Sequence, residues 1–266
     1  MDEALKKHIM SLRELYNKDL GLKRLRLCLY GEKGHGKTSA ALTARRPIYL
    51  QSFDPGGCLL PQADALVKEG HLVVDTSWEG RDTKDPSVLR EWLDWMKDLE
   101  RAKLFEICGT FVLDSLTFWS EFLMAKIIGD DSRNKTDIPQ LQNYVPFQLT
   151  FVNIMKGFYN LPCDVIVTGH ISTEDNDVTG TKRTALNLIG RTTSSKVMAA
   201  FSELWVAKKR VTSSGPSYRI LTQGDGFYEA STRIGSGLFT GEQEPDIQAL
   251  LRQAGWQWQE RPPFEV

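Results

Sequence analysis

Residues 31–38 constrain this chain more than any other part of its sequence, because they read Gly-Glu-Lys-Gly-His-Gly-Lys-Thr. They fill every fixed position of the phosphate-binding pattern G-x-x-x-x-G-K-[ST]. The alternating apolar segment 25–30 before them predicts a strand, and the small residues 39–44 after them are compatible with a helix. A chance glycine turn with a lysine is the alternative, but this strand–turn–helix setting is the one in which the pattern binds phosphate.

The residue types of this loop suit a triphosphate. Its glycines permit backbone angles that let successive N–H groups converge on an anion, and the start of the following helix adds its positive dipole end. Lys37 would reach the terminal phosphates, and the Thr38 hydroxyl would ligate Mg²⁺. We therefore expect ATP and Mg²⁺ as ligands. The expected nucleotide-binding residues are Gly31, Glu32, Lys33, Gly34, His35, Gly36, Lys37, Thr38 and Ser39.

Composition narrows the class of protein. The 266 residues are 41% hydrophobic and 25% charged, as in an ordinary globular protein. No apolar run approaches the roughly 20 residues of a membrane span, and the acidic N-terminus lacks an apolar signal core, so we expect a cytoplasmic protein without membrane contact. The net charge of −1 gives no global basic field, so any contact with nucleic acid must come from local loops. The four cysteines include no C-x-x-C pair and are expected to be reduced thiols.

Strand and helix patterns alternate along the chain. This alternation predicts an α/β fold with a mostly parallel central sheet flanked by helices, followed by an antiparallel hairpin near the C-terminus. Strands are expected at 25–30, 48–53, 71–75, 110–114 and 165–170, helices at 87–102, 115–128, 147–160 and 245–254, and the hairpin at 203–211 and 217–222. The stretches 129–146 and 171–196 are expected to be loops.

The N-terminal segment 2–19 has the spacing of an amphipathic helix, with Leu5, Ile9, Leu12 and Tyr16 on one face. It would either pack on its own domain or form an arm that docks on a neighbouring subunit. We expect three parts: an N-terminal arm at 1–24, a core at 25–255 and a C-terminal tail at 256–266.

Three polar residues follow buried strands of the predicted sheet. Asp114 is expected to hold the shell of Mg²⁺, although an aspartate there would also cap the next helix. Asp54 is the leading candidate to orient or deprotonate water, with a simple turn role before Pro55 as the alternative and Glu79 as a weaker candidate. His170 either contacts the γ-phosphate or is a surface histidine. In such sheets ligands bind at the carboxyl ends of the strands, which favours the functional roles of Asp114, Asp54 and His170 over the structural ones.

With these residues in place, the chain resembles the RecA-type core ATPases. It is most similar to compact phage members described as P-loop single-strand annealing or recombination ATPases, a phage nucleotide-binding AAA-type family. The resemblance runs from about residue 25 to 255. It rests on the segments GEKGHGKTS, FDPGG, TFVLDSLT, VIVTGH, GFYEASTRIGSG and EPDIQALLRQAG.

The resemblance implies roles for particular residues. It supports Asp54 as the catalytic carboxylate, although that residue is usually glutamate, and His170 as the γ-phosphate sensor. Arg233 would reach the nucleotide of a neighbouring subunit, whereas Ser231 stands where such proteins commonly carry a lysine. We expect Arg233 to follow a short strand at 226–230, and an ion pair with Glu229 is its alternative role.

The resemblance also implies partners. Loops 129–146 and 171–196 would touch single-stranded DNA during phage recombination or annealing. The chain would form a homo-oligomer with nucleotide at its subunit interfaces in the bacterial host cytoplasm, with a phage single-strand-binding or replication protein as a possible partner. The expected DNA-binding residues are Arg133 and Lys135, with Tyr144 beside them, and Lys182, Arg183, Arg191 and Lys196.

A second function of a different class stays open. A nucleotide-gated loader or adaptor would bind ATP with little turnover, and the departures at Asp54 and Ser231 favour it. A small-molecule kinase is disfavoured because the sequence shows neither an arginine-rich lid nor an acceptor pocket.

Overall fold

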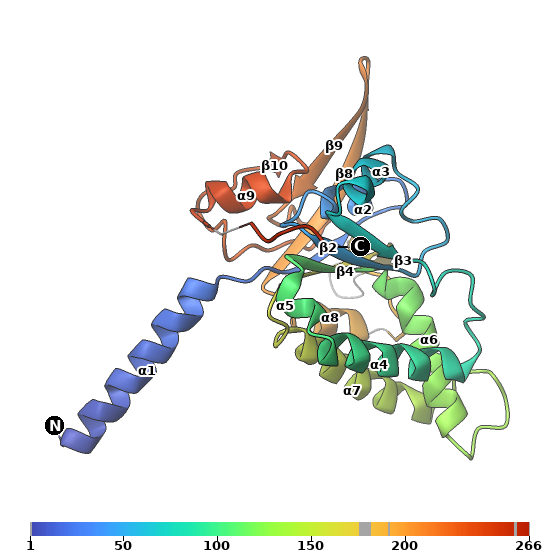
Figure 1. Cartoon of the computed structure of the whole chain (residues 1–266). Coiled ribbons are helices and arrows are strands. Elements are labelled where there is room, and N and C mark those ends of the chain that lie inside the picture. Colours follow the sequence, from blue (N-terminus) through green and yellow to red (C-terminus); the bar gives the residue numbers. More distant parts are fainter. Residues whose placement is uncertain (1, 176–181, 191, 258–259, 266) are drawn as a thin grey trace.

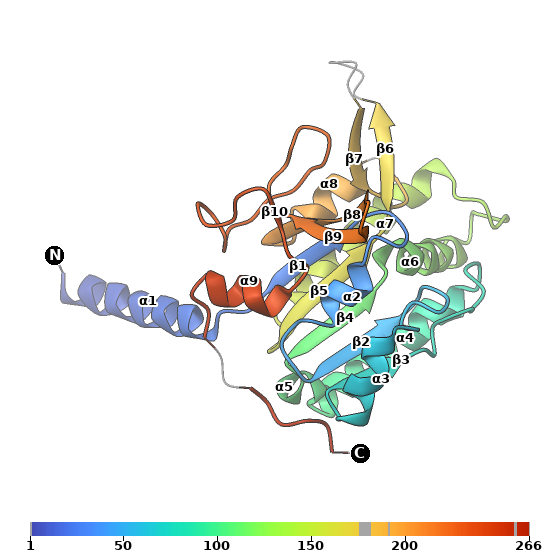
Figure 2. The same ribbon diagram turned by 90° about the horizontal axis from the view of Figure 1, so that it is seen from above.

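A computed structural model describes residues 2–175, 182–190, 192–257 and 260–265. Its main element is an eight-stranded sheet with the order β10-β9-β8-β1-β5-β4-β2-β3 (Figures 1 and 2). The strands from β8 to β3 pair in parallel, whereas β8, β9 and β10 pair antiparallel. The expected α/β fold with a mostly parallel sheet and a C-terminal antiparallel hairpin is thereby confirmed. The bounds are β1 Arg26–Tyr30, β2 Ile48–Ser52, β3 Leu72–Asp75, β4 Thr110–Asp114, β5 Asp164–Gly169, β8 Glu203–Thr212, β9 Gly215–Leu221 and β10 Glu242–Gln243.

Helices cover both faces of this sheet, which explains why its central strands are apolar throughout (Figure 1). Along β1, Leu27 and Leu29 belong to one hydrophobic cluster, and Cys28 and Tyr30 belong to another. The first cluster includes side chains of α2 (Lys37–Ala41), α3 (Pro61–Lys68) and α9 (Ile247–Gln253). The second includes side chains of α4 (Pro86–Arg101), α5 (Leu104–Ile107), α6 (Leu116–Asp130) and α7 (Leu141–Phe158). Strand alternation therefore builds two cores, one on each side of the sheet.

The N-terminal helix α1 (Glu3–Leu22) projects from the rest of the chain instead of packing on it (Figures 1 and 2). It extends to Leu22, beyond residue 19 where the predicted segment ended. Leu5, Ile9 and Leu12 of its apolar face are all exposed. Packing of this face on its own domain is thus not what the structure has.

Both stretches expected to be loops contain regular structure. Within 171–196, strands β6 (Ile171–Asp175) and β7 (Lys182–Leu186) form an antiparallel pair, and helix α8 (Thr193–Met198) follows. Within 129–146, helix α7 begins already at Leu141, because the side chains of Gln140 and Asn143 cap each other's backbone N–H groups. The two loop predictions were wrong at these positions.

The end of the chain contacts the core at the edge opposite the carboxyl ends of the strands. The Arg261 guanidinium donates hydrogen bonds to the carbonyl oxygens of Cys108, Phe105 and Pro162, and the Phe264 N–H donates to the Gly70 carbonyl at 2.8 Å. The described part of the predicted tail 256–266 is therefore bound to the core. In the described part of the chain, no helix is both long and apolar enough to cross a bilayer.

Candidate nucleotide-binding site

The phosphate loop connects β1 to α2 at the carboxyl end of the parallel strands. Gly36 has a φ of +83° and forms the N-cap of α2, a conformation that strains other residues. Gly31 lies so close to β8 that a Cβ there would sit 2.5 Å from the Ala207 carbonyl oxygen. Gly34 has a φ of +76°, so all three loop glycines are favoured by geometry, Gly34 and Gly36 by their backbone angles and Gly31 by a close approach.

Lys37 is buried within this loop. Its Nζ donates hydrogen bonds of 3.0 Å to the carbonyl oxygens of Gly31 and Glu32. Burial lowers the pKa of Lys37, while the charges of Asp114 and Asp54 oppose that shift. The ammonium therefore lies at the loop, next to the carboxylates of the site.

Asp114 lies at the end of β4, two strands away from β1 in the sheet. Its Oδ2 accepts a hydrogen bond of 2.6 Å from the Thr38 hydroxyl, and its Oδ1 accepts one from the Thr168 hydroxyl. Burial raises the pKa of Asp114, and the charge of Asp54 adds to that shift. Sequence reasoning missed Thr168, whose signal was a hydroxyl within an otherwise apolar strand.

These residues fit Mg²⁺, which prefers oxygen ligands and usually keeps several waters and phosphate oxygens in its shell. One carboxylate and one hydroxyl lie together beside the phosphate loop. The described residues contain no cluster of three or more histidine, cysteine or acidic side chains that would enclose a metal by themselves. The donor set thus matches a metal shared with a bound phosphate.

Asp54 and His170 meet beyond the phosphate loop. The His170 Nε2 lies 2.8 Å from Asp54 Oδ2, and the Ser115 hydroxyl donates to Asp54 Oδ1. Burial raises the pKa of Asp54, but the hydrogen bonds from His170 and Ser115 and the charge of Lys37 outweigh it and leave the pKa below its usual value. The His170 N–H donates to the Thr117 hydroxyl at 3.0 Å, which fixes the backbone at the start of β6.

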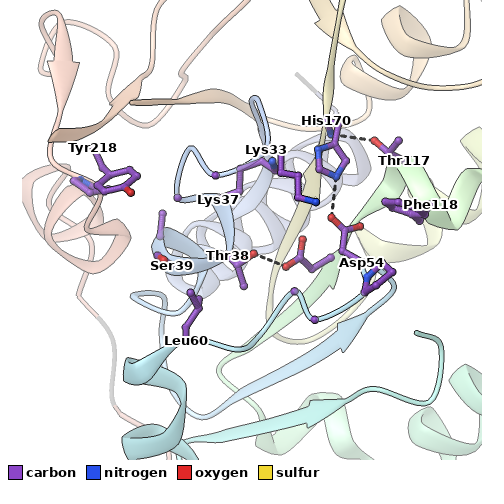
Figure 3. Close-up of a pocket in the computed structure, with 18 of the residues that line it drawn as sticks. Lys33, Lys37, Thr38, Ser39, Asp54, Leu60, Thr117, Phe118, His170 and Tyr218 are labelled. Atoms are coloured by element: carbon purple, nitrogen blue, oxygen red, sulfur yellow. Dashed lines mark hydrogen bonds and ion pairs between the residues drawn. The ribbon is translucent and has the colours of Figure 1, made fainter. Parts of the chain in front are cut away.

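A cavity of about 970 Å³ joins these groups. Figure 3 shows Asp54, His170 and Phe118 on one side of Lys37 and Thr38, and Tyr218 on the other side. The lining includes Lys33, Gly34, Gly36, Lys37, Thr38 and Ser39 of the predicted loop, together with Asp54, Asp114 and His170. The structure therefore brings six of the nine predicted loop residues and the three strand-end residues to one cavity, whereas Gly31, Glu32 and His35 are not part of its lining. It adds Tyr218 and Phe118, which sequence reasoning did not single out.

Glu79 and Arg233, the other two residues predicted to act in hydrolysis, are not among the residues that line this cavity. Glu79 accepts a hydrogen bond of 2.9 Å from the Gly56 N–H, so it supports the turn after Asp54. Arg233 is exposed, its N–H donates to Glu203, and within the described residues its side chain has no ion pair, with Glu229 or otherwise. The strand expected at 226–230 is wrong, since Tyr228 makes only an isolated bridge to Thr184.

The predicted DNA-binding residues are spread over three segments. Arg133 pairs with Asp131, Lys135 is exposed in the turn before α7, and Lys196 on α8 donates to Gln148. The backbones of Lys182 and Arg183 belong to β7, but their side chains lie outside the described ones, as does Arg191 altogether.

A strand, a phosphate loop and a helix, with a buried aspartate two strands away in a mostly parallel sheet, define a P-loop nucleotide-binding fold. A family model described as an AAA domain matches residues 23–207, and the chain belongs to that family.

The solved structures that are similar to the chain include two archaeal proteins. A KaiC-like protein of the archaeon Pyrococcus horikoshii OT3 has 12% identity and a TM-score of 0.41, over 78% of this chain and 82% of its own. The flagellar accessory protein FlaH of Methanocaldococcus jannaschii has 11% identity and a TM-score of 0.39, over 82% of this chain and 88% of its own. No curated protein sequence matches the chain.

Proposed function

We propose that the chain hydrolyses ATP with Mg²⁺ at this cavity. The observation that carries the proposal is the Asp54 carboxylate, which hydrogen-bonds to His170 beside the phosphate loop and lines the same cavity as Lys37. Lys37 would bind the terminal phosphates, and Thr38 and Asp114 would hold Mg²⁺, which neutralises phosphate charge when bound. Asp54 would orient the attacking water.

The pKa of Asp54 decides how it would act. A general base works best with a pKa near the working pH, and the pKa of Asp54 is lowered. The carboxylate is therefore ionised at neutral pH and accepts a hydrogen bond from water, but it draws protons weakly. We infer orientation of water with slow turnover. Glu79 is less suited, because it is not among the residues that line this cavity, whereas Asp54 is.

We further propose that the protein acts on single-stranded DNA in phage recombination or annealing, within the bacterial host cytoplasm. Support comes from the resemblance and from the exposure of Lys135, in the segment before α7, and of Tyr144, in the first turn of α7. A cation for phosphates beside an aromatic ring for bases is the combination that binds single strands. A phage single-strand-binding or replication protein would be a partner.

Two exposed features support a homo-oligomer with nucleotide at its interfaces. Arg233 has a side chain without an ion pair among the described residues, so it is available to a neighbouring subunit. The apolar stripe of α1, formed by Leu5, Ile9 and Leu12, is uncovered and suits a protein partner.

The test is phosphate release by the purified protein with Mg²⁺, measured with and without single-stranded DNA at fixed salt. We expect slow release that single-stranded DNA accelerates. Nucleotide binding with no release in either condition would favour the loader or adaptor function, which the lowered pKa of Asp54 and the hydrogen bonds of Lys37 to its own loop also fit. Release that is insensitive to DNA would remove the DNA part of the proposal.

A further inference from the structure

Tyr218 lines the nucleotide cavity without any part in the chemistry described above. It belongs to β9 of the C-terminal hairpin, where it pairs with Lys209 of β8. We propose that its ring is the surface on which the base of the bound nucleoside triphosphate stacks. The inference rests on the proposed function, and it names the part of the site that recognises the nucleoside.

The expected direction of the bound triphosphate places the nucleoside on the Tyr218 side of the cavity. Asp54 and His170 mark the end where the terminal phosphate and the attacking water would lie. The nucleoside must then leave the loop on the other side of Lys37 and Thr38, where Figure 3 shows Tyr218 and Ser39. Ala40, Thr43 and Pro245 also line the cavity, and Ser39, Ala40 and Thr43 all lie in or directly after α2.

The Tyr218 ring is held in place by contacts that leave it available to a ligand. A Cβ on Gly36 would lie 3.1 Å from its Cδ1, so the ring packs directly against the phosphate loop. On the hairpin, the Lys209 Nζ lies 5.9 Å from the ring centroid. Tyr218 is only half-buried, and within the described residues its hydroxyl has no hydrogen-bond partner. The ring is thus positioned by packing, and its hydroxyl contributes nothing that phenylalanine could not.

Stacking also fits the polar groups at this end of the cavity. The Thr43 hydroxyl donates to the Ala40 carbonyl at 2.6 Å and accepts from the Ile247 N–H at 2.8 Å, so it is occupied within the protein. Tyr218 lines the same cavity, and an aromatic face binds a base through its π-surface, which every base offers. The ligand class is therefore a nucleoside triphosphate held by its phosphates and by one stacked base.

The experiment compares two probes, ATP and inorganic tripolyphosphate, which has the phosphates but no base. Affinities are measured by calorimetry for the wild type and for Tyr218→Ala, Tyr218→Leu, Tyr218→Phe and Lys37→Ala. Tyr218→Leu keeps bulk against Gly36 and serves where the alanine variant fails to fold. We expect Tyr218→Ala and Tyr218→Leu to bind ATP about 5- to 150-fold more weakly, the factor that corresponds to about 1–3 kcal/mol for one stacked base. Their affinity for tripolyphosphate should stay within about twofold, and Tyr218→Phe should restore ATP affinity.

Two results would overturn the inference. An equal loss for both probes would show that the ring only supports the phosphate loop through Gly36, and no loss for either would show that the base lies elsewhere. Lys37→Ala separates this from the proposed function, because it should weaken both probes. If Lys37→Ala changed neither affinity, the phosphate site itself would be wrong, whatever the tyrosine variants show.

Discussion

Asp54 Oδ2 and His170 Nε2 lie 2.8 Å apart, although 116 residues separate them in the sequence. They meet because β4 lies between β2 and β5 in the sheet, so the residues that follow these two strands converge at one edge. This contact links Asp54, the residue proposed to orient water, to His170, which directly precedes β6. A substitution of either residue should therefore affect the position or charge of the other side chain.

Asp54→Asn should lower the turnover of ATP by about 10²- to 10⁴-fold, the contribution expected of a group that orients or deprotonates water. Asparagine has the size of aspartate, so nucleotide affinity should change little. Phosphate release and ATP binding measured on the same preparation test this. The matched control is a double-mutant cycle with His170→Ala, in which the two losses should be non-additive because the side chains are in contact. A loss of less than severalfold in Asp54→Asn would return Asp54 to a turn role and point to Glu79 or to water alone.

Asp114→Asn should abolish most Mg²⁺-dependent turnover while it keeps the fold. Both partners of Asp114 are threonine hydroxyls, which accept as well as donate, so asparagine can keep both hydrogen bonds. The pKa of the folded state is raised above the ordinary 3.8, chiefly by burial. The contribution of Asp114 to stability is then present below that ordinary value and is lost as the pH rises through the raised pKa.

The asparagine variant cannot ionise, so its stability relative to the wild type should improve from acidic to neutral pH when no ligand is present. Urea unfolding at several pH values checks the sign. A variant that loses stability relative to the wild type as the pH rises would contradict the raised pKa of Asp114.

Arg233→Ala and Lys37→Ala subunits should each be inactive alone and partly active when mixed. Arg233→Ala lacks the cation that would neutralise γ-phosphate charge across an interface, and Lys37→Ala lacks the ammonium that would bind the phosphates. Mixed oligomers contain interfaces where an intact loop meets an intact arginine. The measurement is phosphate release at several mixing ratios, with co-assembly checked by size. A mixture that assembles but stays inactive, or full activity of Arg233→Ala alone, would exclude a role in the neighbouring site.

Asp164→Ala should destabilise the fold without a direct effect on the site. The buried Asp164 carboxylate accepts a hydrogen bond of 2.7 Å from the Leu25 N–H and pairs with Arg45 at the start of β5. Removal of one partner of such a pair costs about 3–5 kcal/mol of the free energy of unfolding. Chemical denaturation checks the value, with Asp94→Ala as the control, since Asp94 forms an exposed pair with Lys97. Equal midpoints for the two variants would show that the Asp164 pair contributes little.

The sequence was sufficient where short-range patterns decide the structure. Apolar runs identified the central strands, and the polar residues that follow them, Asp54, Asp114 and His170, lie at one cavity because parallel strands end at a common edge. Contacts between distant segments were not predictable. The hydroxyl of Thr168 stands out within its apolar strand, but the sequence does not say that it donates to Asp114 on the neighbouring strand. Tyr218 faces Gly36 only because the C-terminal hairpin folds back beside β1.

Amphipathic patterns were ambiguous for a different reason. The spacing of Leu5, Ile9 and Leu12 says that one face of α1 is apolar but not which surface covers it, and the structure leaves that face exposed. The start of α7 depends on the side chains of Gln140 and Asn143, which cap each other's backbone N–H groups. Both residues lie in a polar stretch, so composition alone does not distinguish this cap from a loop.

The most direct test of the proposed ATPase compares wild-type protein with Lys37→Ala in Mg²⁺-dependent release of phosphate from ATP. The Lys37 ammonium donates its hydrogen bonds to carbonyl oxygens of the phosphate loop itself, so the variant should keep the fold, as circular dichroism would verify, and lose ATP binding or turnover. We expect measurable release by the wild type and none above background in the variant. Release at the wild-type rate by folded Lys37→Ala would contradict the assignment of this cavity as the site of ATP hydrolysis.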